Sequence, residues 1–305
     1  MKIMHFYLAP RAGDAARQAA RGARRQAAIA SGATPTIGTA PRAPLRDDEA
    51  MSSAPSDIVT AAVLVIGDEI LSGRTKDRNI GYIADCLTAL GIDLKEVRIV
   101  PDEARAIVEA VNALRARYDY LFTTGGIGPT HDDITAECVA QAFGVPLELH
   151  PEAVEILKER LARTGGELNE ARLRMARIPR GARLVANKVS GAPGFWIDNV
   201  IVMAGIPAVM QAMLDEVAPR LKTGARLMSV TIRADAKEGD VGTALGEIAK
   251  ANPGVLIGSY PFFDEKQGPN TNIVVRARDP QKLAEVQAAV EAMLARVKAG
   301  REGSP

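Results

Sequence analysis

From residue 58 onward, the apolar positions alternate between continuous runs and runs with helical spacing. Residues 61–67 (AAVLVIG) form an unbroken apolar run that ends in glycine, as expected of a strand buried on both faces. Residues 92–100 and 119–124 predict two further strands, and apolar residues three or four positions apart predict a helix before each of them. This alternation predicts a doubly wound, mostly parallel α/β sheet.

The same pattern continues beyond the third strand. A helix is predicted from about residue 133 to 143, and another follows Pro151. Residues 194–205 predict a hairpin on the same sheet, and Pro207 then opens a helix with apolar residues on one side. The sequence therefore predicts a three-layer α/β domain over residues 58–222.

Residues 223–305 predict a second, small α+β domain with a short tail. Its last helix has apolar residues in good helical register. The expected elements, in order, are a strand at 226–233, a helix at 241–251, strands at 255–260 and 272–278, and a helix at 281–297.

Residues 1–57 have a different composition. They are rich in Ala, Arg, Gly and Pro, and acidic residues are nearly absent before Asp47. The run RQAARGARRQAA could form a basic helix, a composition that also resembles a transit peptide. We interpret the segment as a disordered tail or as the product of an upstream start, with Met51 as the true first residue.

The charge balance and the cysteines limit the function classes. The 38 Lys and Arg residues nearly cancel the 37 Asp and Glu residues, so there is no strong nucleic-acid-binding signal. No apolar run reaches the roughly 18 residues of a membrane span. Cys86 and Cys138 lack metal-ligand spacing, and we interpret them as buried apolar residues of a cytoplasmic protein.

Two polar motifs follow the first and third predicted strands. Asp68 and Glu69 belong to GDEILSGR, and TTGGIGPTHDD follows the third strand. Consecutive right-handed crossovers often give the strand order 2-1-3, and ligands then bind outside the carboxyl ends of strands 1 and 3. We therefore expect both motifs to share one crevice.

The glycine loop in the second motif is typical of a phosphate site. Gly125, Gly126 and Gly128 allow the backbone to approach a ligand closely. The helix expected from about Asp133 would offer its positive N-terminal end to an anion. The loop is neither a P-loop nor a dinucleotide fingerprint, because it lacks the residues that those motifs require.

Further polar or Gly/Pro segments are expected near this crevice. In the loop that holds Ser72, Thr75, Asp77 and Asn79, one residue should cap the next helix while the others face the crevice. The turns SGAPGF and AGIP offer a second anion site or simply end strands, and we leave both interpretations open.

Four carboxylates flank the phosphate loop and would repel a phosphate unless a divalent cation joins them to it. We predict that Asp68, Asp132 and Asp133 hold Mg²⁺, Mn²⁺ or Co²⁺ and that Glu69 belongs to the same catalytic group. In the alternative interpretation, Asp132 caps the following helix and Asp133 completes its first turn. His131 is a candidate general acid or base, or an exposed loop residue.

Together, these motifs resemble the molybdopterin-binding-like domain of the competence/damage-inducible protein A (CinA) family. The similarity covers about residues 59–221 and rests on GDEILSGRTKDRN, TTGGIGPTHDDIT, NEARLRMARIP, GAPGF and AGIP. The remaining unit resembles the small domain that follows in CinA. Relatives of the family include MogA and MoaB, which bind or adenylylate molybdopterin, and the N-terminal domain of eukaryotic FAD synthases. CinA-type domains are associated with metal-dependent hydrolysis of pyrophosphates such as ADP-ribose and FAD.

The resemblance also implies a ligand-binding set. Asp68, Glu69, Asp132 and Asp133 would serve the metal and the water. The predicted phosphate- and substrate-binding residues are Ser72, Asp77, Asn79, Thr124, Gly125, Gly126, Gly128, Thr130, Asn169, Gly191, Pro193, Gly194, Gly205 and Pro207.

Three departures from the family pattern change what we expect. Full-length CinA continues into a nicotinamide mononucleotide deamidase domain, and this sequence stops before it, so we expect no deamidase activity. Ala204 stands where many members have proline. His131 replaces the proline common in bacterial CinA and gives the form seen in FAD-synthase-linked domains, which favours a flavin or ADP-containing ligand.

The sequence therefore predicts a cation-dependent hydrolase of a nucleoside diphosphate-X such as ADP-ribose or FAD. One alternative is a molybdopterin-binding or adenylyl-transfer protein that uses the same pocket for a pterin phosphate. Another is a ligand-binding module without catalysis. By analogy with the family, we expect a homo-oligomer.

Overall fold

A computed structural model of the chain describes residues 58–266 and 268–302. The predictions made for residues 1–57 lie outside the described residues. Among the helices that the structure describes, none combines the length and the apolar character that crossing a membrane requires.

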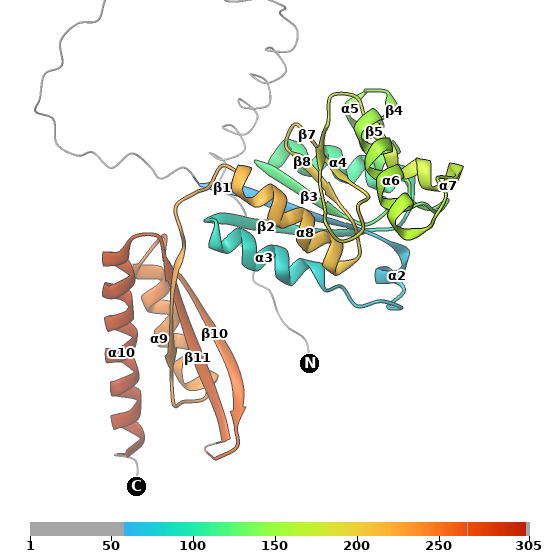
Figure 1. Cartoon of the computed structure of the whole chain (residues 1–305). Coiled ribbons are helices and arrows are strands. Elements are labelled where there is room, and N and C mark those ends of the chain that lie inside the picture. Colours follow the sequence, from blue (N-terminus) through green and yellow to red (C-terminus); the bar gives the residue numbers. More distant parts are fainter. Residues whose placement is uncertain (1–57, 267, 303–305) are drawn as a thin grey trace, which may run out of the picture. The chain divides into compact units, whose positions relative to one another are not determined.

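The described chain forms two compact units (Figure 1). One unit contains Ala61–Asn79 and Lys95–Glu216 and carries the candidate site. The other contains Ile80–Leu94 and the chain from Val217 onward.

The first unit is built on a six-stranded, mostly parallel sheet. β1 runs parallel to β3, and β3 runs parallel to β8, while β7 and β6 are antiparallel. The sheet confirms the doubly wound α/β prediction, including the predicted 2-1-3 order of the first three strands. In sheet order, the strands are β2 (Ile92–Val100), β1 (Val59–Ile66), β3 (Tyr120–Thr124), β8 (Val200–Met203), β7 (Gly194–Ile197) and β6 (Arg183–Val185).

The apolar run of β1 is buried as its sequence predicts, since every residue from 61 to 66 is at most 3% exposed. Leu64 and Leu121 from the sheet share one core with Ile107 of α4 (Ala104–Arg117) and Val139 of α5 (Thr135–Phe143). Burial of such side chains stabilises each by about 1.5–3 kcal/mol relative to exposure. The core therefore fixes the carboxyl ends of the strands, where the polar motifs begin.

Several elements differ from the sequence predictions. α5 begins at Thr135 and not near residue 133. The β7–β8 hairpin is as predicted, whereas the short antiparallel pair β4 (Leu147–Leu149) and β5 (Arg177–Pro179) was not predicted. The remaining helices described between residues 58 and 220 are α2 (Asp68–Leu71), α3 (Asn79–Ala89), α6 (Pro151–Thr164), α7 (Glu170–Leu173) and α8 (Pro207–Val217), with 3-10 turns at Arg174–Ala176 and Ala218–Arg220.

The C-terminal part of the chain forms a three-stranded antiparallel sheet with two helices, in the predicted element order. The central strand β11 contributes Ile273 and Val275 to a core with Val241 of α9 and Val286 of α10. β10 and β11 pair over nine positions and extend well beyond the predicted strands. The elements are β9 (Met228–Arg233), α9 (Glu238–Ala251), β10 (Leu256–Asp264), β11 (Gly268–Ala277) and α10 (Pro280–Glu302).

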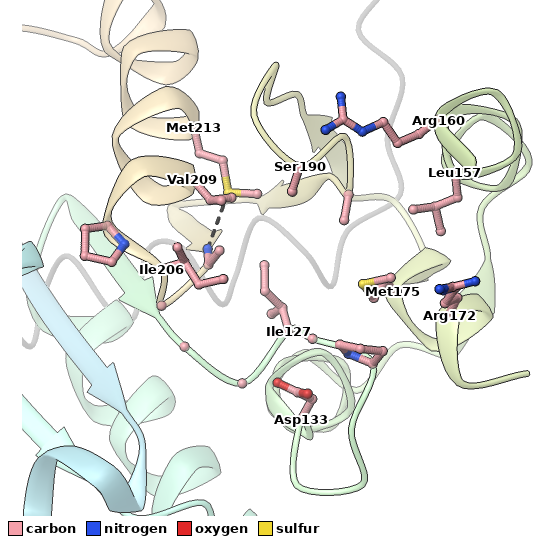
Figure 2. A pocket seen from close by; sticks show the side chains of 18 of the residues that line it. Ile127, Asp133, Leu157, Arg160, Arg172, Met175, Ser190, Ile206, Val209 and Met213 are labelled. Atoms are coloured by element: carbon pink, nitrogen blue, oxygen red, sulfur yellow. Dashed lines mark hydrogen bonds between the residues drawn. The ribbon is translucent and has the colours of Figure 1, made fainter. Parts of the chain in front are cut away.

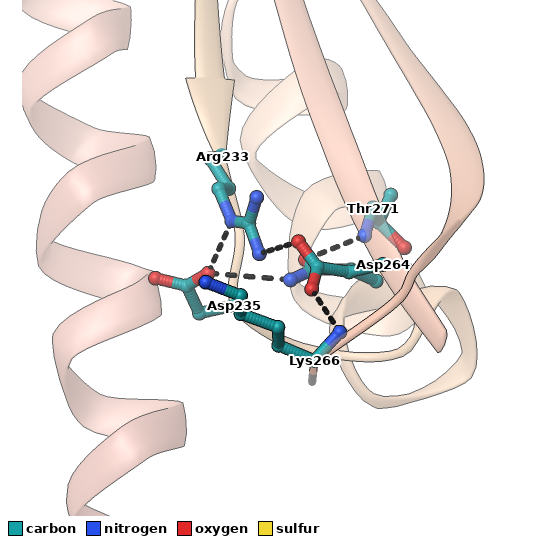
Figure 3. Close-up of polar contacts among 6 residues, drawn as sticks. Arg233, Asp235, Asp264, Lys266 and Thr271 are labelled. Atoms are coloured by element: carbon teal, nitrogen blue, oxygen red, sulfur yellow. Dashed lines mark hydrogen bonds and ion pairs between the residues drawn. The ribbon is translucent and has the colours of Figure 1, made fainter. Parts of the chain in front are cut away.

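A polar network joins the end of β9 to the β10–β11 hairpin (Figure 3). Arg233 Nε donates to Asp235 Oδ1 at 2.6 Å, and Arg233 Nη2 donates to Asp264 Oδ2 at 2.8 Å. Asn270 Nδ2 donates to the same Asp235 oxygen at 3.2 Å. Hydrogen bonds from Arg233 and Asn270 hold the pKa of the Asp235 carboxyl below its usual value.

Candidate functional site

The carboxyl ends of β1, β2 and β3 lie at one edge of the parallel sheet. Asp68 follows β1, and its backbone N–H donates to Oδ2 of Asp102 at 2.9 Å. Asp102 itself follows β2, and the N–H of Gly67 donates to the carbonyl of Val100 at 3.2 Å. The ends of the first two strands are therefore hydrogen-bonded to each other.

Asp102 lies where several negative charges meet. Partial burial raises the pKa of the Asp102 carboxyl, and the charges of Asp68, Glu69 and Asp132 raise it further. The hydrogen bond from the Asp68 amide acts in the opposite direction. Since Asp132 belongs to the loop after β3, carboxylates from three strand ends influence one another. We call Asp68, Glu69, Asp102 and Asp132 the acidic edge.

The donor set of the acidic edge suits a hard divalent cation. Within the described part of the chain, no three His, Cys, Asp or Glu side chains are grouped closely enough to form a ligand set for a metal. Mg²⁺ at phosphate sites needs only one or two carboxylates, because phosphate oxygens and waters complete its shell. The other carboxylates of the acidic edge repel the charge of Asp102, and a bound cation would reduce this repulsion.

Asp133 has a role within its own loop. Its Oδ2 accepts the backbone N–H of Thr130 at 2.8 Å and also accepts the Thr130 hydroxyl. α5 begins only at Thr135, and no side chain caps it. The interpretation of Asp132 as a helix cap and Asp133 as part of the first turn is therefore wrong. The chain after Pro129 closes a tight turn on the Asp133 carboxylate before the helix starts.

His131 and Asp132 lie on the outer side of this turn. Their side chains are 97% and 59% exposed, and His131 Nδ1 lies 3.9 Å from Asp132 Oδ1. The Thr130 hydroxyl, which donates to Asp133, also lowers the pKa of the Asp132 carboxyl, as does the backbone N–H of Asp132. The location of His131 agrees with the exposed-loop interpretation.

The glycine loop depends on the absence of side chains. Gly125 has φ 102°, and a Cβ there would overlap the carbonyl oxygen of Ile66 in β1. The Thr135 hydroxyl donates to the Gly125 carbonyl at 3.0 Å and fixes the loop to the start of α5. In the part of the chain that the structure describes, the backbone N–H groups of residues 126–128 donate to no protein acceptor. They are therefore available to an anion.

A pocket of about 550 Å³ opens above this loop (Figure 2). Its volume lies within the range of about 300–1,000 Å³ that is usual for small-molecule sites. The loop forms one wall, and α8 faces α6 and α7 across the pocket. The side chains that Figure 2 labels around it are Ile127, Asp133, Leu157, Arg160, Arg172, Met175, Ser190, Ile206, Val209 and Met213.

The pocket brings together part of the predicted set. Asp133 and Glu69 are the carboxylates in its lining, and Thr75 joins them. The predicted site residues that line it are Glu69, Gly125, Gly126, Gly128, Asp133, Gly205 and Pro207.

Other predicted residues hold the loops around the pocket. Asn79 is only 4% exposed, and its Nδ2 donates to the carbonyl of Gly205 at 2.8 Å. Asp77 Oδ1 accepts the N–H of Asn79, the first residue of α3, and the Ser72 hydroxyl donates to the Glu69 carbonyl at 3.4 Å. Thr124 is buried at the end of β3. These contacts fix the path of the chain between β1 and α3.

The residues of the NEARLRMARIP and GAPGF motifs have mostly local contacts. Asn169 Oδ1 accepts the N–H of Arg172 at 2.9 Å and caps α7. Pro193 lines a small cavity beside the pocket. Gly194 lies in β7, where a Cβ would overlap the carbonyl of Val202. Gly191 adopts φ 79°, in the left-handed region.

Sequence reasoning missed Asp102 and the α6–α7 wall. The signal for Asp102 was available, because an acidic residue directly after a predicted parallel strand has the same placement as Asp68. Arg160 and Arg172 gave no such signal, since helical arginines are ordinarily solvated.

Comparisons with known proteins match both parts of the chain. The family described as "Probable molybdopterin binding domain" matches residues 62–223, which include the acidic edge, the glycine loop and the pocket. The family described as "FAD synthase, middle domain" matches residues 226–301.

Individual relatives agree with these matches. A protein of Caldivirga maquilingensis is 35% identical over 249 residues, which cover 78% of this chain and 96% of that protein. A CinA-like protein of Citrifermentans bemidjiense is 44% identical over 165 residues, and the matched region covers 52% of this chain and 40% of that protein. The crystal structure of the protein CinA, of unknown function, from Thermoplasma acidophilum is 32% identical with a TM-score of 0.50, covering 53% of this chain and 98% of that one. These similarities confirm the predicted resemblance and fold.

Proposed function

Because the chain belongs to the family of molybdopterin-binding domains and is CinA-like, we propose that it is a divalent-cation-dependent pyrophosphatase. Its substrate would be a nucleoside diphosphate-X such as ADP-ribose or FAD. One observation carries the proposal: an acidic edge made by three strand ends borders a pocket of about 550 Å³ and a glycine loop whose amides have no acceptor among the described residues.

The glycine loop would bind one phosphate of the substrate. The N–H groups of residues 126–128 lack protein acceptors within the described chain and line the pocket. Amides fixed in this way stabilise charge that develops on phosphoryl oxygens, because they need no reorganisation during the reaction. The apolar side chains of α8 would pack against the uncharged part of the ligand.

The acidic edge would hold the cation through Asp102 together with Asp68 or Asp132, and phosphate oxygens and waters would complete its shell. A bound Mg²⁺, Mn²⁺ or Co²⁺ would neutralise phosphate charge and polarise a phosphoryl oxygen. Glu69 is the member of the acidic edge that lines the pocket. We therefore propose that its carboxylate accepts a proton from the attacking water. Attack at phosphorus breaks the P–O–P bond, and the bridging oxygen leaves with the electron pair to give AMP and the second phosphate product. His131 is not among the residues that line the pocket, so we assign it no role in this step.

The test is AMP release from ADP-ribose and from FAD with Mg²⁺, Mn²⁺ or Co²⁺. Glu69→Gln and Asp102→Asn should each lower kcat by about 10²-fold or more. Asp85→Asn is the matched control, because Asp85 is exposed on α3 outside the acidic edge. Absence of AMP with every metal would contradict the proposal.

The family match favours a second candidate function, the binding of a pterin phosphate. A molybdopterin-binding or adenylyl-transfer protein would use the glycine loop for the same phosphate contact. It would bind molybdopterin tightly and adenylylate it with ATP. If Asp102→Asn and Glu69→Gln leave ligand affinity intact and the wild type shows no turnover, the pocket is a binding module.

A further inference from the structure

We propose that Arg160 and Arg172 bind the second phosphate of a diphosphate ligand and make the site selective for diphosphates over monophosphates. The inference rests on the proposed function of the same pocket, and its test is separable from that function. Both arginines line the pocket, Arg160 from α6 and Arg172 from α7 (Figure 2).

Each guanidinium is held in place by a backbone carbonyl. Arg160 Nη2 donates to the carbonyl of Val189 at 2.8 Å, and Arg172 Nη1 donates to the carbonyl of Glu167. Over the described ranges, 58–266 and 268–302, neither guanidinium is paired with a carboxylate. Both keep further N–H donors and an uncompensated charge, the combination that binds phosphate oxygens most strongly.

The turn at residues 187–190 holds the Arg160 side chain in position. Asn187 Oδ1 accepts the N–H groups of Val189 at 3.1 Å and Ser190 at 2.7 Å, which orients the Val189 carbonyl toward Arg160. Gly191 follows with φ 79°, and a Cβ there would lie 3.2 Å from Cγ of Arg160. The glycine therefore leaves the space that the arginine stem occupies. This gives Gly191 a positioning role in place of the direct ligand contact that we predicted.

Asn169 has the equivalent role for Arg172. Its Oδ1 accepts the backbone N–H of Arg172 and caps the short helix α7. Side-chain caps of this kind stabilise a helix start by about 1 kcal/mol. Asn169 is exposed and lies outside the pocket lining, so it acts through Arg172.

The charges of the lining explain the selectivity. Glu69 and Asp133 are its acidic side chains, and Arg160 and Arg172 its basic ones. A monophosphate can be bound by the glycine-loop amides alone. A second phosphate on the same ligand adds charge-assisted hydrogen bonds to the arginines, which a monophosphate cannot form.

Equilibrium binding of ADP and AMP, both with Mg²⁺, tests the proposal without requiring turnover. The wild type should bind ADP at least about ten-fold more tightly than AMP, since one good charge-assisted contact is worth that much. Arg160→Gln and Arg172→Gln should each weaken ADP binding about ten-fold and change AMP binding less than about two-fold. Arg163→Gln is the control, because Arg163 lies on α6 with a 78% exposed side chain paired with Glu159.

Asn169 supplies the positioning test. Asn169→Ala should weaken ADP binding while AMP binding stays constant, and Asn169→Ser, which keeps a capping oxygen, should restore it. Thermal unfolding of each variant checks that the fold is intact. A merely structural role of Asn169 would affect ADP and AMP equally.

The outcomes separate the inference from the proposed function. Equal affinity of the wild type for ADP and AMP, or unchanged ADP binding in both arginine variants, would overturn the inference even if AMP is released from ADP-ribose. Selective ADP binding that both variants lose would support it even if no hydrolysis is found.

Discussion

At the residue scale, the pKa of Asp102 depends on residues that are distant in sequence. It follows β2, yet its pKa responds to Asp68 and Glu69 after β1 and to Asp132 after β3. The sequence motifs gave three of these carboxylates, because they lie beside conspicuous glycines. Asp102 has no such neighbour, and the signal for it is its position after β2, the strand next to β1 in the sheet.

Asp102→Asn should increase the stability of the metal-free protein at pH 7. The folded-state pKa of Asp102 is raised, so the ionised carboxyl disfavours folding above that pKa and the penalty disappears as pH falls. Asparagine keeps an acceptor for the Asp68 N–H. We expect a gain below about 1 kcal/mol, because the group is largely solvent-accessible. Urea unfolding should show a larger gain at pH 7 than at pH 4, because the penalty is fully lost only below the unfolded pKa, and a loss at pH 7 would contradict this account.

Gly126 and Gly144 have the same φ angle, so alanine at each position distinguishes the cost of left-handed backbone strain from the cost of steric overlap. Gly126 and Gly144 both have φ 65°, but a Cβ at Gly126 would overlap the Thr135 hydroxyl, whereas the space at Gly144 is open. Gly144→Ala should cost about 1–2 kcal/mol of unfolding free energy from left-handed strain alone. Gly126→Ala should cost about 1 kcal/mol more, because the hydrogen bond from Thr135 to Gly125 must shift. Equal losses in denaturant unfolding would refute the proposed overlap.

At the scale of elements, long periodic segments were predictable and short ones were not. β2 was predicted to the residue, since IDLKEVRIV lies between a helix-ending glycine and a proline. The three-residue strands β4 and β5 carry too few residues to show a period. The start of α5 was misplaced because Asp132 and Asp133 resemble helix caps. In the structure, the Asp133 carboxylate closes a turn with Thr130.

The network at the end of β9 gives an element-scale prediction. Asp235→Asn keeps the Oδ1 acceptor and tolerates φ 48°, but it removes the charge that pairs with Arg233. The folded-state pKa of Asp235 is lowered, so its contribution is present above the unfolded pKa and is lost as pH falls through the folded value. We expect a melting temperature about 1–3 °C lower at pH 7, since the pair is largely exposed. If the melting temperatures of Asp235→Asn and the wild type differ by the same amount at pH 2.5, charge pairing is not the cause of the difference.

At the scale of the whole molecule, the strand order made the meeting of the two motifs predictable. The packing of α6 and α7 forms the rest of the candidate site. The 2-1-3 strand order was enough to bring the two motifs to one edge, and the sheet confirms that order. The pocket wall of α6 and α7 could not be predicted, because nothing in the periodicity of α6 shows that Arg160 faces a cavity. The family matches then place both parts of the chain among known domains.

Ligand binding should stabilise the unit that carries the site. A ligand at 100 times its Kd raises unfolding free energy by about 2.7 kcal/mol. In thermal unfolding, ADP with Mg²⁺ should therefore raise the transition of the site-bearing unit, and neither ADP nor Mg²⁺ alone should reach the same shift. If Mg²⁺ makes no difference to the ADP effect, the cation does not bridge the acidic edge and the phosphates.

The proposed mechanism requires a cation bound at the acidic edge, with Asp102 among its ligands. Titration of Mn²⁺, followed by the electron paramagnetic resonance signal of the free ion, measures this without a substrate. We predict one Mn²⁺ per chain, with affinity at least about ten-fold lower in Asp102→Asn and unchanged in Asp85→Asn. Equal Mn²⁺ affinity in the wild type and Asp102→Asn would contradict the central claim.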